Sequence, residues 1–313
     1  MRVVHRLNET DLASCSLVTV GVFDGVHLGH QRIISGLVEA AHSLGHSAVA
    51  ITFDPHPASV LTDRPPPLLT TVGERIDLLE HLGLDTMAIL PFTGDVVATT
   101  AAAFVEDLIR HLRLAELWVG PDFTLGYGQE GDVPYLRRLG IARGFSVRVI
   151  DPVVWGGTIV RSSRVRQALR QGDIEQANGC LGRNYRLSGV VVRGRGLGRT
   201  IGVPTANISP PPSRLVPAGG VYAAWAHSER WGEHAAAVNI GTRPTFAAQP
   251  NEQGLTVEAH LLDFDGDLYD DVLKVDFVAR LRDERPYPTL NALVAQLRHD
   301  IAHTRALLDN KRP

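Results

Sequence analysis

Residues 21–30 have the sequence Gly21-Val22-Phe23-Asp24-Gly25-Val26-His27-Leu28-Gly29-His30. The apolar segment Leu17–Phe23 leads into this stretch, and apolar residues at helical spacing follow it. This pattern predicts a strand that turns directly into a helix. Gly25 and Gly29 allow a ligand to approach the backbone closely, and the free N–H groups of the helix start favour phosphate. His27 and His30 lie at the same turn and can donate hydrogen bonds to phosphate oxygens, which favours a nucleotide site over a solvated turn.

The composition is that of an ordinary globular protein. The 313 residues are enough for about two domains, and the formal net charge of −3 gives no general attraction to nucleic acid or to an anionic membrane. The only cysteines, Cys15 and Cys180, cannot form a disulfide framework or a paired-cysteine zinc site. Because no signal peptide and no membrane-spanning run is found, we expect a cytoplasmic protein that binds neither nucleic acid nor membrane. We expect a monomer or a weak homo-oligomer.

Strand and helix signals alternate up to about residue 183. A strand at Leu17–Phe23, a helix at His30–Ser43 and a strand at Ala48–Phe53 form one βαβ unit, which implies parallel strands with right-handed crossovers. The pattern predicts further strands and helices at Glu74–Leu82, Met87–Leu90, Ala101–Leu112, Leu117–Val119, Val147–Ile150, Ser163–Arg170 and Ile174–Cys180. The first half is therefore predicted to be a Rossmann-like α/β domain with a doubly wound parallel sheet.

The pattern changes from Tyr185 onward. Short β-like runs are separated by turns, and they lie at Leu187–Val192, Val221–Ala226, Ala235–Ile240, Thr256–Leu262 and Val272–Val278. Helical periodicity returns only from Leu290 to about Leu308. This order predicts a small antiparallel β-barrel, or a sandwich, followed by a C-terminal helix. We place the boundary near Gly182–Tyr185, which gives domains of residues 1–183 and 184–313.

Two loops of the first half carry candidate ligand-binding residues. His56 follows the second strand, in Phe53-Asp54-Pro55-His56-Pro57, at the sheet edge where ligands of such folds bind. Asp122 and Phe123 lie in a loop of aromatic residues and glycines that can stack on a planar ring. A rigid turn and ordinary loop packing are the simpler interpretations of these two loops.

A predicted helix near residue 162 begins with hydroxyl and guanidinium groups. Ser162, Ser163 and Arg166 at a helix N-terminus are well suited to triphosphate oxygens, although Ser163 can equally be a helix cap with solvated arginines around it. A zinc site at His27 and His30 is disfavoured, because two histidines three residues apart need a third protein ligand that the nearby sequence does not supply.

A second glycine-rich stretch is Gly194-Arg195-Gly196-Leu197-Gly198-Arg199-Thr200-Ile201-Gly202-Val203-Pro204-Thr205-Ala206-Asn207. Its backbone can fold over phosphates, so Gly196, Gly198, Gly202 and Thr205 are candidate nucleotide contacts. Thr205 and Asn207 alternate with Ala206, which places their oxygens on one face, where they suit Mg²⁺. The spacing matches neither a Walker motif nor a protein-kinase loop, and the generic pattern alone favours a glycine-rich hairpin.

The predicted strand at Thr256–Leu262 contains one carboxylate, Glu258, between Val257 and Ala259. A carboxylate on a β-like run is usually an outward surface residue.

These motifs resemble those of one family. The His-x-Gly-His element is similar to the signature of the nucleotidyltransferase superfamily. The longer Gly-Val-Phe-Asp-Gly-Val-His-Leu-Gly-His-Gln resembles the bacterial bifunctional riboflavin kinase/FMN adenylyltransferase, or FAD synthetase, family. The Phe-x-Pro-His-Pro, Gly-x-Asp-Phe and Gly-Arg-x-x-Gly-x-Pro-Thr-Ala-Asn elements resemble the same family and follow its order. Leu125 stands where the family more often has Phe, and Arg161 and Ser163 stand at a serine and a threonine of its Ser-Ser-Thr-x-Ile-Arg signature.

The resemblance implies a bifunctional enzyme. Its C-terminal barrel would phosphorylate riboflavin with ATP to FMN, and its N-terminal domain would adenylylate FMN with a second ATP to FAD and pyrophosphate, with Mg²⁺ as the cofactor. His27 and His30 would stabilise charge in the transition state, and Glu258 would be the base of the kinase. The nucleotide contacts would include Gly21, Phe23, Asp24 and Gly25, and the flavin contacts would be His56, Asp122, Phe123 and Arg282.

Two rival hypotheses remain open at this point. One is a flavin-binding sensor or carrier that has lost catalysis. The other is an adenylyltransferase for a different phosphate acceptor. Analysis of the flavin products formed from riboflavin and ATP distinguishes all three.

Overall fold

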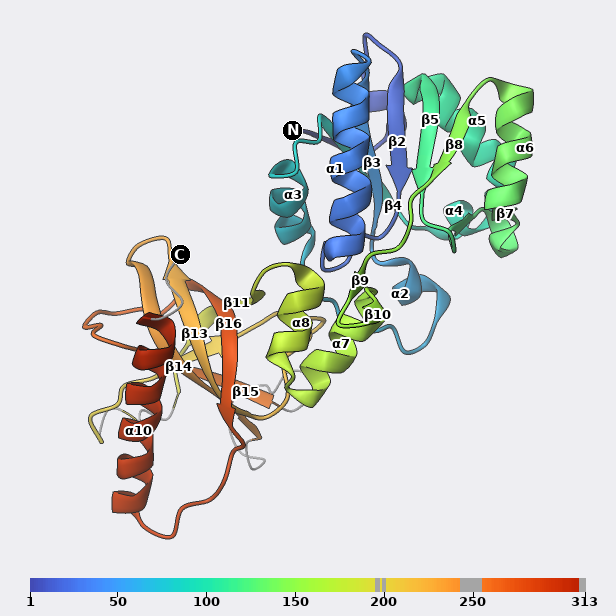
Figure 1. The fold of residues 1–313 in the computed structure, drawn as a ribbon. Coiled ribbons are helices and arrows are strands. Elements are labelled where there is room, and N and C mark those ends of the chain that lie inside the picture. Colours follow the sequence, from blue (N-terminus) through green and yellow to red (C-terminus); the bar gives the residue numbers. More distant parts are fainter. Residues whose placement is uncertain (195–197, 199–200, 243–254, 310–313) are drawn as a thin grey trace. The chain divides into compact units, whose positions relative to one another are not determined.

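A computed structural model describes residues 1–194, 198, 201–242 and 255–309, which belong to two units (Figure 1). The first unit is Met1–Arg161 and the second is Ser162–Pro313, and each is described by itself. Across the described residues, no helix combines the length and the apolar character that crossing a membrane requires.

The first unit is built on a six-stranded sheet in the order β1-β4-β3-β2-β5-β8, and every neighbouring pair is parallel. The strands are β1 (Arg2–Val4), β2 (Ser16–Val20), β3 (Ser47–Asp54), β4 (Thr86–Pro91), β5 (Leu114–Val119) and β8 (Ser146–Val149). From β2 the chain moves outward through β3 and β4, and it then returns to place β5 on the other side of β2. Ligands of open α/β sheets bind at such a reversal, at the carboxyl ends of the strands.

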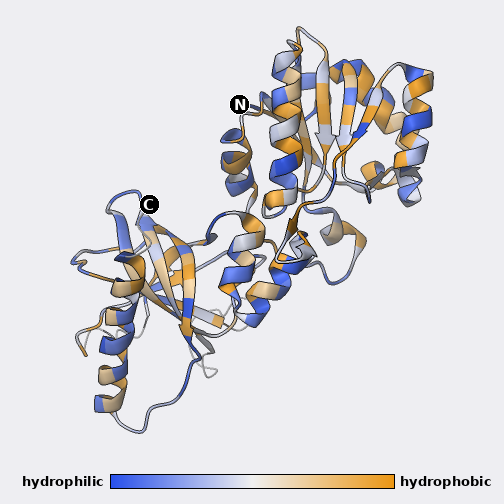
Figure 2. Ribbon diagram, viewed as in Figure 1, coloured by the Kyte–Doolittle hydropathy of each residue, from blue (hydrophilic) through white to orange (hydrophobic). Residues whose placement is uncertain are grey.

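Helices cover both faces of this sheet. Side chains alternate along a strand, so neighbouring residues of β2 pack on opposite faces. Leu17 packs in the core with α1 (Leu28–Ser43) and α3 (Val72–Glu80), whereas Val18 packs with α5 (Ala101–Leu112) and α6 (Val133–Arg143). Helix α1 also carries both apolar and polar residues, as Figure 2 shows. The helices and paired segments are η1 (Leu7–Glu9), α1 (Leu28–Ser43), α2 (Pro57–Leu61), α3 (Val72–Glu80), α4 (Gly94–Ala98), α5 (Ala101–Leu112), β6 (Thr124–Leu125), η2 (Tyr127–Gln129), β7 (Gly131–Asp132), α6 (Val133–Arg143), β9 (Val154–Trp155) and β10 (Thr158–Ile159).

The predicted Rossmann-like, doubly wound parallel sheet is confirmed. The helix expected at Ala101–Leu112 has those bounds as α5. Strand β2 ends at Val20 and not at Phe23, because the backbone of Phe23 has a positive φ of 52° that no strand can accommodate. The edge strand β1 and helix α6 were not predicted, since β1 has three residues and α6 buries only Leu136 and Gly140.

The second unit contains a closed antiparallel barrel in the order β11-β12-β15-β14-β13-β16, which confirms the predicted barrel. Strand β12 was not predicted, because it has four residues and overlaps the glycine-rich stretch. It lies between β11 and β15, so it completes the closure. The elements of this unit are α7 (Ser162–Gln171), α8 (Ile174–Leu181), β11 (Tyr185–Val192), β12 (Ala206–Ser209), β13 (Gly220–Ser228), β14 (Gly232–Thr242), β15 (Leu255–Leu261), β16 (Val272–Arg282) and α10 (Leu290–Asp309).

Aromatic rings and one arginine fill part of the barrel. The rings of Tyr222 and Phe277 meet edge to face with centroids 5.3 Å apart, and the hydroxyl of the buried Tyr185 donates to the Leu215 carbonyl. The fully buried Arg214 donates from Nη2 to the Arg186 carbonyl at 2.7 Å. A buried guanidinium needs such partners, because its desolvation is costly.

Helices α7 and α8 belong to the second unit, although the sequence pattern grouped them with the α/β domain. The side chain of Asn178 explains part of this grouping: its Nδ2 donates to the Phe277 carbonyl at 2.8 Å, and its Oδ1 accepts from the Tyr185 N–H at 2.8 Å. The Ala218 N–H donates to the Leu169 carbonyl of α7 at 2.9 Å. The division of function near residue 183 remains a prediction.

We expect a fragment of residues 162–313 to be more stable than one of residues 184–313. The shorter fragment loses the burial of Ala177, Cys180 and Leu181, and a buried Leu alone contributes about 1.5–3 kcal/mol. Urea denaturation of both fragments measures the difference. Asn178→Ala in the longer fragment should cost about 1–3 kcal/mol, because the side chain loses its hydrogen bonds to Asn184, Tyr185 and Phe277. Equal unfolding midpoints for the two fragments would show that α7 and α8 do not support the barrel.

Candidate active sites

The turn from β2 to α1 holds its backbone in an unfavourable conformation. Phe23 and Val26 have positive φ values of 52° and 38°, and Gly25 has 83°. A non-glycine residue in this region costs about 1–3 kcal/mol and persists only where its surroundings fix it. The turn therefore needs anchors on its other residues.

Asp24 supplies one of these anchors. Its buried carboxylate accepts hydrogen bonds from the backbone N–H groups of Leu69 and Thr70 at 3.0 Å and from the Thr70 hydroxyl at 3.1 Å. The Gly25 N–H donates to the same hydroxyl at 2.9 Å. Asp24 and Gly25 thus tie the turn to a segment more than 40 residues away, and their predicted contact with nucleotide remains a prediction.

His27 and His30 lie together at the start of α1. The imidazole rings stack with centroids 3.6 Å apart, and Nδ1 of His27 accepts a hydrogen bond from the His30 N–H at 3.3 Å. The Phe23 ring meets His30 edge-on at 5.3 Å. A Cβ at Gly29 would lie 3.1 Å from Cε1 of His27, so a glycine at this position allows the stacked arrangement.

Burial keeps His30 neutral. Desolvation holds the pKa of His30 well below its usual value, and the neighbouring His27 lowers it further. Nδ1 of His30 is buried and has no hydrogen-bond partner within the described part of the chain. Because buried polar atoms are nearly always satisfied in native proteins, this nitrogen is available to a ligand.

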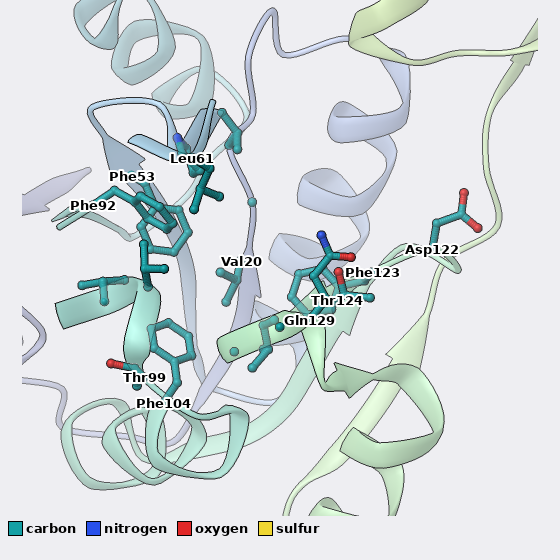
Figure 3. Close-up of a pocket in the computed structure, with 18 residues that line it drawn as sticks. Val20, Phe53, Leu61, Phe92, Thr99, Phe104, Asp122, Phe123, Thr124 and Gln129 are labelled. Carbon is teal, nitrogen blue, oxygen red and sulfur yellow. The ribbon is translucent and has the colours of Figure 1, made fainter. Parts of the chain in front are cut away.

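A cavity of about 570 Å³ lies beside this turn, at the carboxyl ends of β2 and β3. Figure 3 shows Phe53 and Phe92 on one side of it and Phe123 with Thr124 on the other, with Val20 between them. The rings of Phe53 and Phe92 meet edge to face at 5.2 Å. The walls are Val20, Gly21, Val22, Phe53, Pro57, Leu61, Phe92, Val96, Val97, Thr99, Phe104, Asp122, Phe123, Thr124, Leu125, Gly126, Gly128 and Gln129. A mostly apolar cavity with several aromatic walls suits a planar ring system.

The predicted flavin residues of the first unit have different positions. Phe123 lines the cavity, and Asp122 lies at its rim in an exposed ion pair with Arg161 at 2.6 Å. His56 instead caps α2, where its Nδ1 accepts from the Ala58 N–H at 3.0 Å, and its neighbour Pro57 lines the cavity. A flavin contact of His56 therefore remains a prediction.

Ser162, Ser163 and Arg166 lie in the first turns of α7 and belong to the second unit. Ser163 is exposed, Ser162 is half-buried and Arg166 is 8% exposed. The two units are described separately, so a site that these residues share with His27 and His30 remains a prediction.

Three polar side chains form a row across the barrel of the second unit. Glu258 of β15 lies directly opposite Asn207 of β12 on one side and Asn239 of β14 on the other. Directly opposite residues of antiparallel strands share one face. Val257 and Ala259 are buried in the barrel, so this row faces outward.

A cavity of about 270 Å³ lies over two members of this row, Glu258 and Asn239, whereas Asn207 is not among its lining residues. Its lining includes four of the predicted site residues, Gly198, Thr205, Glu258 and Arg282. A Cβ at Gly194 would overlap the amide of Asn207, so the glycine makes room for that side chain. Gly196 lies outside the described residues. Gly202 has a φ of +76°, which a side chain would strain.

Arg282 joins the barrel to the C-terminal helix. It makes a bidentate ion pair with the buried Asp300 of α10, with Nη2 to Oδ2 at 2.6 Å, and this hydrogen bond raises the pKa of Arg282. Gln296 donates to the same carboxylate at 2.8 Å. Arg282 thus lines the cavity while it fixes α10, and its predicted contact with flavin remains a prediction.

Among the described residues, no three histidine, cysteine or acidic side chains gather as a metal site. The hydroxyl of Thr205 and the amide oxygen of Asn207 are hard donors that suit a cation which also binds substrate phosphates.

Comparisons with known proteins find one family model that matches the first half of the chain and another that matches the second half. Residues 10–164 match the family model for FAD synthetase, and residues 181–308 match the model for riboflavin kinase. The bifunctional riboflavin kinase/FMN adenylyltransferase of Escherichia coli (strain K12) is 36% identical over 302 residues, which are 96% of this chain and 95% of the relative. The protein of the same name from Bacillus subtilis (strain 168) is 32% identical over 299 residues, or 95% and 93% of the two chains.

A solved structure extends the likeness to the fold. The crystal structure of a macrolide-efflux protein from Streptococcus pneumoniae superimposes with a TM-score of 0.87 at 28% identity and covers 97% of this chain and 99% of that one. Both halves of the sequence thus match the two catalytic modules in their order, and curated relatives share over 30% identity across nearly the full length. The chain belongs to the bifunctional riboflavin kinase/FMN adenylyltransferase family.

Proposed function

We propose that the first unit adenylylates FMN and the second phosphorylates riboflavin, so that the chain makes FAD from riboflavin and two ATP. The family matches over residues 10–164 and 181–308 support this assignment. The observation that carries it is the pair of separate cavities, each beside one cluster of the predicted catalytic residues.

In adenylyl transfer, a phosphate oxygen of FMN attacks the α-phosphorus of ATP, and the bond to pyrophosphate breaks. The aromatic cavity of about 570 Å³ would hold the isoalloxazine ring. The neutral imidazole of His30 keeps an unpartnered nitrogen for hydrogen bonding at the helix start, where the dipole of α1 favours phosphate. The histidines would act by holding and stabilising charged oxygens, not as nucleophiles.

In the kinase reaction, the 5′-hydroxyl of riboflavin attacks the γ-phosphorus of ATP and ADP leaves. Glu258 would accept the hydroxyl proton, since it lies on a rigid strand that lines the second cavity. Thr205 and Asn207 would hold Mg²⁺, which when bound neutralises charge on the phosphates. The register that sets Asn207 beside Glu258 supports these paired roles.

We expect the wild-type chain to convert riboflavin and Mg-ATP to FMN and FAD, which a carrier or an adenylyltransferase for another acceptor would not do.

The His30→Ala variant should accumulate FMN, because losing one preorganised hydrogen-bond donor costs on the order of a hundredfold in rate. Chromatography of the flavin products measures both steps. His42→Ala, an exposed histidine of the same helix, is the matched control and should form FAD normally. Equal loss of both reactions in His30→Ala would contradict the assignment.

Glu258→Gln keeps the size and hydrogen bonding of the side chain but removes the base. Riboflavin phosphorylation should fall on the order of a hundredfold or more, while supplied FMN is still converted to FAD. Glu233→Gln, on the exposed end of β14, provides a control that should leave both rates unchanged. Full kinase turnover by Glu258→Gln would leave the second site without this base.

Asn207→Ala should raise the Mg²⁺ concentration that half-saturates riboflavin phosphorylation, because one of the two proposed protein ligands is lost. The Mg²⁺ dependence of FMN adenylylation should stay as in the wild type. Titration of both reactions with Mg²⁺ after treatment with a chelator measures this difference. An unchanged Mg²⁺ dependence would show that Asn207 does not hold the cation.

A further inference from the structure

One buried arginine of the first unit lies outside every site described so far. Arg75 lies on α3, one helical turn before Leu79, and both side chains face the core with 2% and 0% of their surface exposed. Burial lowers the pKa of its guanidinium, against the opposing charges of Asp24 and Asp54. An apolar side chain of similar volume would fill this position at lower cost, so packing alone does not explain an arginine here.

The guanidinium contacts the turn that carries the histidines. Nη1 of Arg75 donates to the Val22 carbonyl at 2.7 Å and to the Thr52 hydroxyl at 3.1 Å. The Thr52 hydroxyl donates to the same carbonyl at 3.0 Å. The Val22 carbonyl therefore accepts two hydrogen bonds, one from Arg75 and one from Thr52. Val22 directly precedes Phe23, the first residue of the turn with a positive φ. Nε of Arg75 is buried without a hydrogen-bond partner among the described residues.

Two anchors thus hold the turn on either side of Phe23. Asp24 is fixed by Leu69 and Thr70, as described above, and Val22 is fixed by Arg75 and Thr52. Val22 also lines the aromatic cavity. A shift of its carbonyl would move the wall of the cavity and the strained backbone that leads to His27.

We propose that Arg75 is a positioning residue for adenylyl transfer: by holding the Val22 carbonyl, it keeps the strained turn in the conformation that places His27 and His30 at the start of α1. This inference rests on the function proposed for the first unit. Arg75 touches no substrate in this role. Its effect is transmitted through the backbone of residues 22–26.

The test compares Arg75→Met with Arg75→Lys in the full chain. Met keeps the apolar stem and removes all donors, whereas Lys keeps one charged donor that can reach the Val22 carbonyl. We expect Arg75→Met to lower kcat for FAD formation at least about tenfold, with KM for ATP and FMN changed less than about threefold, because small displacements of catalytic groups cost rate more than binding. Arg75→Lys should recover most of kcat.

Two further measurements separate positioning from general destabilisation. Riboflavin phosphorylation in the second unit should be unchanged in both variants, and hydrogen exchange in Arg75→Met should accelerate at the amides of residues 23–26 while the amides of β3 stay protected. Arg214→Met is the matched control, since it removes an equally buried arginine from the barrel. FAD formation from FMN should not change in that variant.

The outcomes distinguish this inference from the proposed function. If Arg75→Met lowers only the melting temperature and kcat is normal well below it, Arg75 is structural and the inference is overturned. If exchange accelerates equally over the whole first unit, the inference is also overturned. Normal FAD formation by His30→Ala would instead reject the proposed role of the histidines, whatever the Arg75 variants do.

Discussion

The first unit depends on one strained turn between β2 and α1. Phe23 and Val26 adopt a left-handed backbone that neither residue prefers, and this conformation brings two imidazole rings into contact at the helix start. The energy that offsets the strain comes from hydrogen bonds to Asp24 and to the Val22 carbonyl, all made by residues far along the chain. Thr52 on β3, Arg75 on α3, and Leu69 and Thr70 in the segment before α3 therefore do more than fill the core. They supply the fixed partners without which the turn would relax.

The fold was predictable wherever an element buries a periodic apolar stripe by itself. Helix α5 satisfies this condition, and its bounds were predicted from the sequence. Strands β1 and β12 have three and four residues and gain their stability from neighbouring strands, so no local pattern identifies them. Helices α7 and α8 show a different limit. Their apolar stripes predicted two helices, but a stripe does not say whether it packs on a sheet or on a barrel.

The same contrast between local sequence patterns and contacts with distant residues applies to the candidate sites. The motifs predicted site roles for His30, Thr205 and Glu258, because these residues lie in short stretches with a distinctive order. Their partners were not predictable, because tertiary contacts between distant segments select them. Thr70 meets Asp24 across 46 positions, and the register of β14 on β15 sets Asn239 beside Glu258. The neutral state of His30 is likewise a consequence of burial, which the order of residues in the turn does not reveal.

The two units present different chemistry to phosphate. The first offers the start of α1 with the neutral imidazole of His30, which can donate a hydrogen bond to a phosphate oxygen. The second offers a carboxylate between two amides on a rigid barrel face. Attack by an FMN phosphate needs no base, since that oxygen is already ionised, whereas attack by a hydroxyl requires a group to accept its proton. In the proposed assignment, the carboxylate of Glu258 lies in the unit whose nucleophile must lose a proton, and the neutral imidazole of His30 lies in the unit whose nucleophile has none to lose.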